Sequence, residues 1–151
     1  MVCWGNICRS PTAEGILRHL AEARGLAVEV DSAGTSNEHA GSPPDHRAIS
    51  EAARRGIDLA GLRARQIRPS DFFDFDLILT ADGMVDRVVR RQAPPNTRAS
   101  IRRMTETGPD FAQYPDVPDP YFGGAEEYTL VFNLLERALT GLLASLEGER
   151  A

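Results

Sequence analysis

The stretch CWGNICRSP, residues 3–11, decides how the chain is interpreted, because it predicts a short strand, a tight loop and the start of a helix. Ser10 is a preferred N-cap residue, and Pro11 suits the first helical position. Small or apolar residues then recur at helical spacing, at Ala13, Ile16, Leu17 and Leu20. Gly25 is well placed to end this helix. A loop that runs into a helix N-terminus directs free backbone N–H groups and the positive end of the helix dipole at one spot, so the stretch predicts an anion site.

Three residues of this loop add chemistry to the anion site. Gly5 allows a tight turn and a close approach of the backbone to a ligand. Arg9 carries a planar fork of donors that suits two phosphate oxygens at once. Cys3 would hold its sulfur beneath the bound phosphorus, where positive surroundings make a thiol ionise easily. The loop therefore predicts an anion cradle with a nucleophile at its base.

The pattern Cys-x5-Arg-Ser/Thr resembles the signature of cysteine-dependent phosphatases, and residues 3–11 resemble the low-molecular-weight protein tyrosine phosphatase version. In that family a separate Asp-Pro-Tyr near the C-terminus supplies an acid, and this chain has Asp119-Pro120-Tyr121. The resemblance covers essentially all 151 residues and implies a single domain over residues 1–151. It implies a three-layer α/β sandwich with a four-stranded parallel sheet in the flavodoxin-like order 2-1-3-4, with the loop at the switch point.

Periodicity along the rest of the chain agrees with an α/β protein, because strands alternate with helices. Strands are expected at residues 27–31, 77–80 and 99–104, the last at an edge of the sheet. Helices are expected from about Asp45 to Gly56, in a short turn after Ser70, from Asp82 to Pro94, and from about Glu126 to Leu146. In the helix after Asp82, the residues expected to face inward are Met84, Val85, Val88 and Val89. Residues 105–124 form a loop whose length suggests function.

The start of the chain conflicts with this fold. The first strand should be central in the sheet, yet only Met1 and Val2 precede Cys3, whereas family members carry several more apolar residues there. Strands are usually about five or six residues long. We therefore expect a truncated first strand and low stability, from a start internal to the true reading frame or from a truncated protein.

Composition excludes several classes of protein. A chain of 151 residues suits one domain with a full hydrophobic core, and the net charge of −5 argues against a nucleic-acid binder. We identify no apolar run of membrane-spanning length and no signal peptide. The two cysteines do not resemble a secreted disulfide framework. We expect a cytoplasmic monomer that does not insert into membranes.

The resemblance implies a mechanism in which Cys3, Arg9 and Asp119 are catalytic. The Cys3 thiolate attacks phosphorus in line and forms a phosphocysteine, while the loop amides and Arg9 hold the three equatorial oxygens. Asp119 protonates the departing phenolate and then acts as base for the water that releases phosphate. No metal or organic cofactor is required. The alternative for Cys3 is a buried structural thiol.

The resemblance also implies substrate-binding and supporting residues around the loop. The substrate-binding set is Trp4, Gly5, Asn6, Ile7, Cys8, Ser10, Tyr121 and Phe122. Ser10 could donate its hydroxyl to the Cys3 thiolate, and Asn6 keeps the loop in shape through a left-handed turn. Ser32 and Glu14 match family positions that support Asn6. The alternatives are a turn serine at position 32 and a solvated helix acid at position 14.

Specificity should come from the walls of the pocket. Trp4, Tyr121 and Phe122 could line a deep slot that admits an aryl phosphate and excludes phosphoserine, although Phe122 could also be a core residue. Ile7 favours tyrosine phosphate, because the related arginine phosphatases have threonine there. Cys8 is a candidate resolving thiol, which would form a disulfide with an oxidised Cys3. The three histidines, His19, His39 and His46, are expected at the surface.

These observations predict hydrolysis of protein phosphotyrosine and aryl phosphates. In bacteria such enzymes often oppose tyrosine kinases that control surface polysaccharide export, so a tyrosine kinase is a candidate partner. Two alternatives remain. An arsenate reductase on the same fold would need further cysteines downstream, and none follows Cys8. A phosphate- or phosphotyrosine-binding module could have lost turnover through its short start and through Leu62, which stands where many members carry a histidine.

Overall fold

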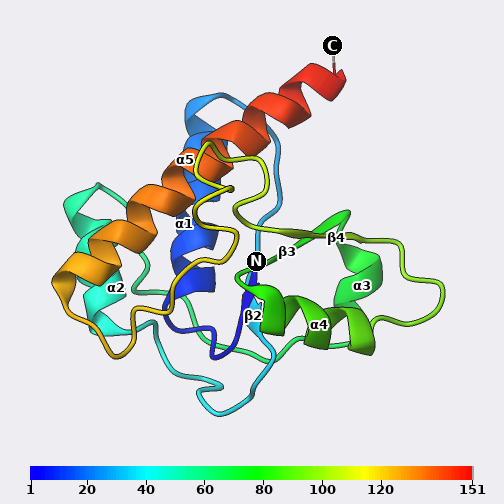
Figure 1. The fold of residues 1–151 in the computed structure, drawn as a ribbon, viewed down its shortest axis with the longest axis horizontal. Coiled ribbons are helices and arrows are strands. Elements are labelled where there is room, and N and C mark those ends of the chain that lie inside the picture. The colour runs from blue at the N-terminus through cyan, green and yellow to red at the C-terminus, as the bar shows by residue number, and fades with distance from the viewer. Residues whose placement is uncertain (151) are drawn as a thin grey trace.

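The chain forms a four-stranded parallel sheet with helices on both of its faces (Figure 1). A computed structural model describes residues 1–150. The strands are β1 (Val2–Cys3), β2 (Ala33–Gly34), β3 (Leu77–Thr80) and β4 (Ser100–Arg103). The helices are α1 (Arg9–Ala23), α2 (His46–Arg54), α3 (Asp71–Asp74), α4 (Gly83–Gln92) and α5 (Ala125–Arg150). The strand order is β2-β1-β3-β4, which confirms the order expected from the resemblance.

The sheet brings the carboxyl ends of its strands to one edge. In β1, Cys3 pairs with Gly34 of β2, and Val2 pairs with Thr80 of β3. β4 lies at the edge and pairs with β3 along its whole length. Because all four strands are parallel, the loop after β1 leaves the sheet between its neighbours at the carboxyl edge, where open α/β sheets bind ligands.

The strand expected at residues 27–31 does not form. β2 comprises two residues, and the preceding segment runs without a sheet ladder. The physical reason is the shortness of β1, which offers that segment no partner. In place of a longer β1, a cavity of about 520 Å³ lies between Val28–Asp31 and the start of β3. Its apolar lining includes leucines of β3, α1 and α5: Leu77, Leu79, Leu17, Leu142, Leu143 and Leu146.

Two apolar layers enclose the sheet. Side chains of α1, α2 and α5 pack against one face, and α3 and α4 cover the other, as Figure 1 shows. On the second face, Phe72 of α3 meets Val85 and Val89 of α4. The prediction that Met84 faces inward is wrong, because its side chain is 65% exposed. Val88 is half-buried, so α4 presents a narrower apolar stripe than the sequence suggests.

The helix boundaries are set by caps that differ in part from those expected. Cys8, not Ser10, is the N-cap of α1, because the helix begins at Arg9 and Ser10 turns its hydroxyl toward Cys3. Gly25 follows this helix with φ of +64°, which glycine adopts without strain. Asp82, at which helix α4 was expected to begin, is the N-cap of that helix, since its carboxylate accepts the N–H of Val85 at 2.8 Å.

Helix α5 is long and apolar enough to span a membrane by length and composition alone. The expectation that no apolar run approaches that length is therefore wrong. Within the fold, however, 44% of its most apolar window is buried, and the helix packs against α1 and α2. Its inward stripe includes Phe132, Leu135 and Leu139, which have almost no exposed surface. These are the contacts of a core helix.

Candidate active site

The loop between β1 and α1 wraps around the sulfur of Cys3. The backbone N–H of Asn6 donates to Cys3 Sγ at 3.2 Å, and Ser10 Oγ lies 3.0 Å from the same sulfur. Asn6 has φ of +56°, which is the left-handed turn that the resemblance implies at this residue. β2 passes close behind, since a Cβ at Gly34 would lie 2.7 Å from the carbonyl oxygen of Trp4. The loop therefore curls its backbone around a buried thiol.

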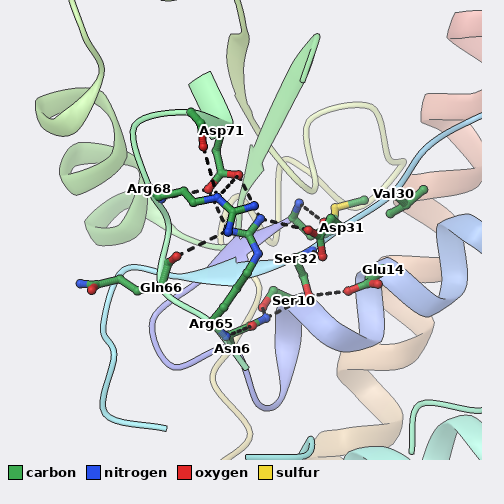
Figure 2. A network of polar contacts seen from close by, with 12 residues as sticks. Asn6, Ser10, Glu14, Val30, Asp31, Ser32, Arg65, Gln66, Arg68 and Asp71 are labelled. Atoms are coloured by element: carbon green, nitrogen blue, oxygen red, sulfur yellow. Dashed lines mark hydrogen bonds and ion pairs between the residues drawn. The ribbon is translucent and has the colours of Figure 1, made fainter. Parts of the chain in front are cut away.

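A chain of buried polar side chains holds the strained residue in place (Figure 2). Asn6 Nδ2 donates to Ser10 Oγ at 2.7 Å and to Ser32 Oγ at 3.0 Å. Ser32 in turn donates to Glu14 Oε1 at 2.5 Å. On the other side, Asn6 Oδ1 accepts the backbone N–H of Arg65 at 3.0 Å. The structure thus brings together Asn6, Ser32 and Glu14, the three residues that the resemblance named for keeping the loop in shape, and it adds Ser10 and the backbone of Arg65.

Arg65 extends this network outward, although nothing in the sequence pointed to such a role. Its guanidinium binds both carboxylate oxygens of Asp71 at 2.9 and 3.0 Å and Asp31 at 3.1 Å, as Figure 2 shows. Burial alone would raise the pKa of Asp71, but the hydrogen bonds from Arg65 and from the N–H of Arg68 outweigh it and lower that pKa. No sequence motif marks Arg65 as part of the site, because Arg63 and Arg65 look like ordinary charged residues of a loop.

Arg9 is the first residue of helix α1, and it is almost fully buried. Its Nη1 donates to Asp82 Oδ2 at 2.7 Å and to the carbonyl of Val117 at 3.0 Å. Burial opposes the charge, but the nearby Cys3, Asp82 and Asp119 more than offset it, so the pKa of Arg9 is raised. Asp82 therefore both caps α4 and orients Arg9. The sequence showed the first role only.

Asp119 reaches the same place from the long loop before α5. Its Oδ2 lies 3.9 Å from Nη2 of Arg9, and its Oδ1 accepts the N–H of Tyr121 at 3.1 Å. The side chain is 53% exposed and lines the pocket together with Cys3. A carboxyl group near the N-terminal end of the chain's last helix is thus brought next to the loop at the other end of the sequence.

A pocket of about 330 Å³ opens above Cys3. Its walls come from the loop after β1, from residues 38–39 and from residues 119–122: Cys3, Trp4, Gly5, Ile7, Cys8, Arg9, Glu38, His39, Asp119, Tyr121 and Phe122. Phe122 lies at the rim with 93% of its surface exposed and packs edge-on against Tyr121. The larger cavity beside Val28–Asp31 lies near Met1, at the amino end of the parallel strands, away from Cys3.

His39, which was expected at the surface, lines the pocket. Its ring meets Trp4 edge-on at 6.3 Å between centroids, and a Cβ at Gly5 would lie 3.1 Å from it. Glu38 lines the pocket beside it. No motif marked this pair, because they stand in a loop whose course depends on tertiary contacts. Together they form the part of the pocket wall that comes from residues 38–39.

Cys8 points away from the loop's centre toward helix α5. Its sulfur lies 3.3 Å from the hydroxyl of Tyr128, and both residues are buried. Burial raises the pKa of Cys8 to about 12. Both cysteines are free thiols. The role of Cys8 as a resolving thiol stays a prediction.

The arrangement offers a thiol, a fixed cation, the backbone N–H groups of a loop that leads into a helix N-terminus, and a carboxyl group around one pocket. Loop amides and a guanidinium can neutralise an oxyanion, and the thiol lies below it for attack. The carboxyl group stands at the mouth, where a departing group would need a proton. These parts suit displacement at a tetrahedral oxyanion such as a phosphate ester.

Comparison with known proteins gives concordant matches. A sequence model of the family described as low molecular weight phosphotyrosine protein phosphatase matches residues 1–151. The low molecular weight protein-tyrosine-phosphatase YfkJ of Bacillus subtilis is 40% identical, over 99% of this chain and 95% of its own length. A protein tyrosine phosphatase of Entamoeba histolytica, solved with Hepes in its active site, superimposes with a TM-score of 0.93 and 32% identity, over 99% of this chain and 96% of that one.

A further structural match is a Drosophila arginine phosphatase, DARP, with a TM-score of 0.91 and 28% identity. It covers 96% of this chain and 94% of its own.

Proposed function

The chain belongs to the low-molecular-weight phosphotyrosine protein phosphatase family, and we propose that it hydrolyses protein phosphotyrosine and aryl phosphates through a phosphocysteine. The family is one of phosphoric monoester hydrolases. The observation that carries the proposal is the convergence of Cys3, Arg9 and Asp119 on one pocket from distant parts of the sequence. A nucleophile, a cation and an acid around one pocket are the groups that the proposed cleavage of a phosphate ester requires.

In the first step, the Cys3 sulfur attacks phosphorus as the bond to the aryl oxygen breaks. The loop N–H groups and Arg9 hold the equatorial oxygens, whose negative charge persists through a loose transition state. Ser10, 3.0 Å from Cys3 Sγ, donates to the sulfur and stabilises its negative charge as attacking and as leaving group. Arg9 remains charged throughout, because the surrounding acidic groups raise its pKa.

Asp119 delivers the proton that the leaving oxygen requires. Phenolates leave slowly without a proton, and general acid catalysis contributes about 10²–10⁴-fold. In the second step the same carboxylate takes a proton from water, which attacks the phosphocysteine and releases inorganic phosphate and the thiolate. Its exposure of 53% at the mouth of the pocket supports access to both the substrate oxygen and solvent.

The walls of the pocket favour an aromatic phosphoryl donor. Trp4 and Tyr121 are exposed aromatic residues at the mouth, and rings of this kind give a phenyl group large apolar contact. Ile7 adds an apolar surface where the arginine phosphatases carry threonine. We therefore propose phosphotyrosine in a protein as the natural substrate, with a bacterial tyrosine kinase as one candidate partner and the cytoplasm as the site of action.

The first prediction concerns the nucleophile and the acid. Replacing Cys3 by Ser should abolish phosphate release from p-nitrophenyl phosphate. The serine hydroxyl would not ionise to an alkoxide, and its oxygen would not fit a site shaped around a sulfur. Asp119→Ala should slow phenyl phosphate hydrolysis by about 10²-fold or more while substrate still binds. Steady-state assays of phosphate release at pH 5–7 measure both. Turnover that survives Cys3→Ser would falsify the mechanism.

A binding module without turnover would show a different pattern. It would bind phenyl phosphate or phosphotyrosine peptide in calorimetry, and neither the parent protein nor any variant would release phosphate. The same assay therefore separates catalysis from binding alone.

A further inference from the structure

The segment that carries Asp119 is anchored to helix α2 by the guanidinium of Arg47. Arg47 Nη2 donates to the carbonyl of Tyr121 at 2.9 Å, and Nη1 donates to the carbonyl of Gly123 at 3.0 Å. The N–H of Tyr121 donates to Asp119 Oδ1. Tyr121 therefore binds Asp119 through its backbone N–H and Arg47 through its backbone carbonyl. Figure 1 shows this part of the chain passing the N-terminal end of α2 before α5 begins.

Arg47 is itself held in one orientation. Asp45 accepts Nε and Nη2 of Arg47 through its two carboxylate oxygens, each at 3.0 Å, and also accepts the Arg47 N–H at 2.9 Å as the cap of α2. These hydrogen bonds lower the pKa of Asp45. The guanidinium carbon also lies 4.8 Å from the ring centre of Tyr128 and 5.7 Å from that of Tyr121. A bidentate pair and two aromatic rings leave the side chain little freedom.

The pair Asp45–Arg47 is also joined to the anion loop, which is the loop around Cys3 formed by residues 3–10. The backbone N–H of Asp45 donates to the carbonyl of Ile7 at 2.8 Å. Contacts therefore run without a break from the loop around Cys3, through Asp45 and Arg47, to the segment that presents Asp119. Arg47 lines no part of the pocket, so its charge does not touch a bound phosphate.

We propose that Arg47 is a positioning residue for the general acid, which holds residues 119–123 so that Asp119 faces the pocket above Cys3. The inference rests on the proposed function and names a residue that acts through Asp119. Without Arg47, two carbonyls lose charged donors and the segment gains freedom. Proton delivery to the leaving group then falls, whereas the cradle of loop amides and Arg9 remains intact.

The test compares aryl phosphates whose phenols differ in acidity. A weakly acidic phenol depends on Asp119 for its departure, and a strongly acidic one scarcely does. Arg47→Ala should lower kcat/KM about tenfold for phenyl phosphate and by about twofold or less for p-nitrophenyl phosphate. Arg47→Lys should give an intermediate loss, because one ammonium group cannot reproduce the planar fork that joins Asp45 to two carbonyls.

Three controls separate positioning from damage. Arg54→Ala, on the same helix and paired with Glu51, should leave the dependence on phenol acidity unchanged. Competitive inhibition by inorganic phosphate should stay within about twofold in Arg47→Ala, because the cradle is preserved. In an Asp119→Ala background, Arg47→Ala should cause no further loss, since both changes remove the same step.

Several outcomes would overturn the inference. Equal losses with every aryl phosphate, weakened phosphate inhibition to the same degree, or an additive loss in the Asp119→Ala background would each show a general structural role. If Arg47→Ala does not fold by circular dichroism, the same series with Arg47→Lys decides. Failure of the proposed function looks different: the parent protein would then release no phosphate from any aryl phosphate.

Discussion

Asn6 shows how much of the site depends on single side chains. It occupies a left-handed conformation that costs a non-glycine residue energy, and it uses both ends of its amide to stabilise that conformation. Glycine could adopt the same backbone but would lose the bonds to Ser10, Ser32 and Arg65. The loop therefore needs a residue that tolerates the turn and also connects three buried partners.

A second prediction concerns the two thiols. Burial raises the pKa of Cys8 to about 12 from about 9, so in the folded protein it remains a neutral thiol up to about pH 11. Iodoacetamide between pH 7 and 9 should therefore modify Cys8 far more slowly than in urea-unfolded protein. Tandem mass spectrometry that assigns the label to Cys3 or to Cys8 within residues 1–9, with Cys8→Ser as the control, measures this. Equal labelling in folded and unfolded protein would contradict it.

The sign of this shift also affects stability. Because the folded state holds the proton of Cys8 more tightly than the unfolded state, this thiol's contribution is fully present below pH 9. It is lost as pH rises from about 9 toward 12, where the unfolded thiol ionises first.

At the scale of single residues, the sequence predicted chemistry better than orientation. Cys3, Arg9 and Asp119 were recognisable, because their types and order resemble a known signature. Ser10 was misplaced as a cap, since a hydroxyl that faces a sulfur looks the same in sequence as one that faces a backbone N–H. His39 and Arg47 gave no signal, because their roles arise from loops that only tertiary contacts bring together.

Among the elements, β1 and β2 depart furthest from a normal α/β sheet. Each has two residues, while β3 and β4 have four. Strand β3 pairs fully with β4 but meets β1 through Thr80 alone. The apolar pattern at residues 27–31 correctly marked a segment that packs on the core, yet it could not form a strand without a neighbour. The local apolar pattern therefore predicts that a segment is buried, but formation of a strand also requires a neighbouring strand that can pair with it.

A third prediction follows from the cavity beside β1. Adding about four apolar residues before Met1 should extend β1 between Val28–Asp31 and β3, filling part of the 520 Å³ space and pairing free backbone groups. Each buried aliphatic side chain contributes about 1.5–3 kcal/mol, and ordering each residue costs about 1–2 kcal/mol. A net gain of about 2–3 kcal/mol would raise the thermal midpoint by about 5–10 °C.

The matched comparison for this extension is a Gly-Ser addition of equal length. It offers backbone groups but no apolar side chains, so it should leave the midpoint almost unchanged in a thermal scan. An apolar extension that raised the midpoint no more than the Gly-Ser addition would show that the cavity does not accept a strand.

The helices were the most predictable elements. Caps and periodicity located α2 and α4 closely, because Asp45 and Asp82 each accept a backbone N–H of the first turn. The last helix extends further than its stripe suggested, from Ala125 to Arg150, since charged residues continue a helix as readily as apolar ones. The sheet order came from the resemblance rather than from periodicity.

Across the whole molecule, arginine–aspartate pairs join segments far apart in sequence. Arg9 pairs with Asp82, and Arg65 pairs with Asp31. Arg65 also binds Asp71, six positions later in the chain, and all three pairs lie beside the anion loop or its supports. For Asp82, burial alone would raise the pKa, but the N–H of Val85 and the guanidinium of Arg9 lower it. The same balance lowers the pKa of Asp71. The net charge of −5 therefore gives no sign that buried arginine and aspartate side chains are paired with one another.

A fourth prediction concerns acid. Because Asp71 and Asp82 have lower pKa values in the folded state than the ordinary 3.8, the unfolded state binds protons first as pH falls. Their contribution to stability is fully present above about pH 4 and is lost progressively below it. Urea unfolding at pH 7, 5, 4 and 3 should show a falling free energy of unfolding.

In this series Asp71→Asn is the informative variant. It should be less stable at pH 7, because Arg65 loses a charged partner, and its stability should change less between pH 5 and 3. A parent protein with equal unfolding free energies at pH 5 and pH 3 would refute the assignment.

The buried amide of Asn6 has a consequence for how fast a ligand can be captured. Because the protein's own side chains fix the curve of the loop, the entropy of ordering it is lost when the chain folds. An arriving oxyanion then needs to shed water and collide in the right orientation, without waiting for a backbone rearrangement. The frequency of encounters, rather than loop motion, would then limit the rate of binding. Any small tetrahedral oxyanion in the buffer would compete with the substrate for the same binding site.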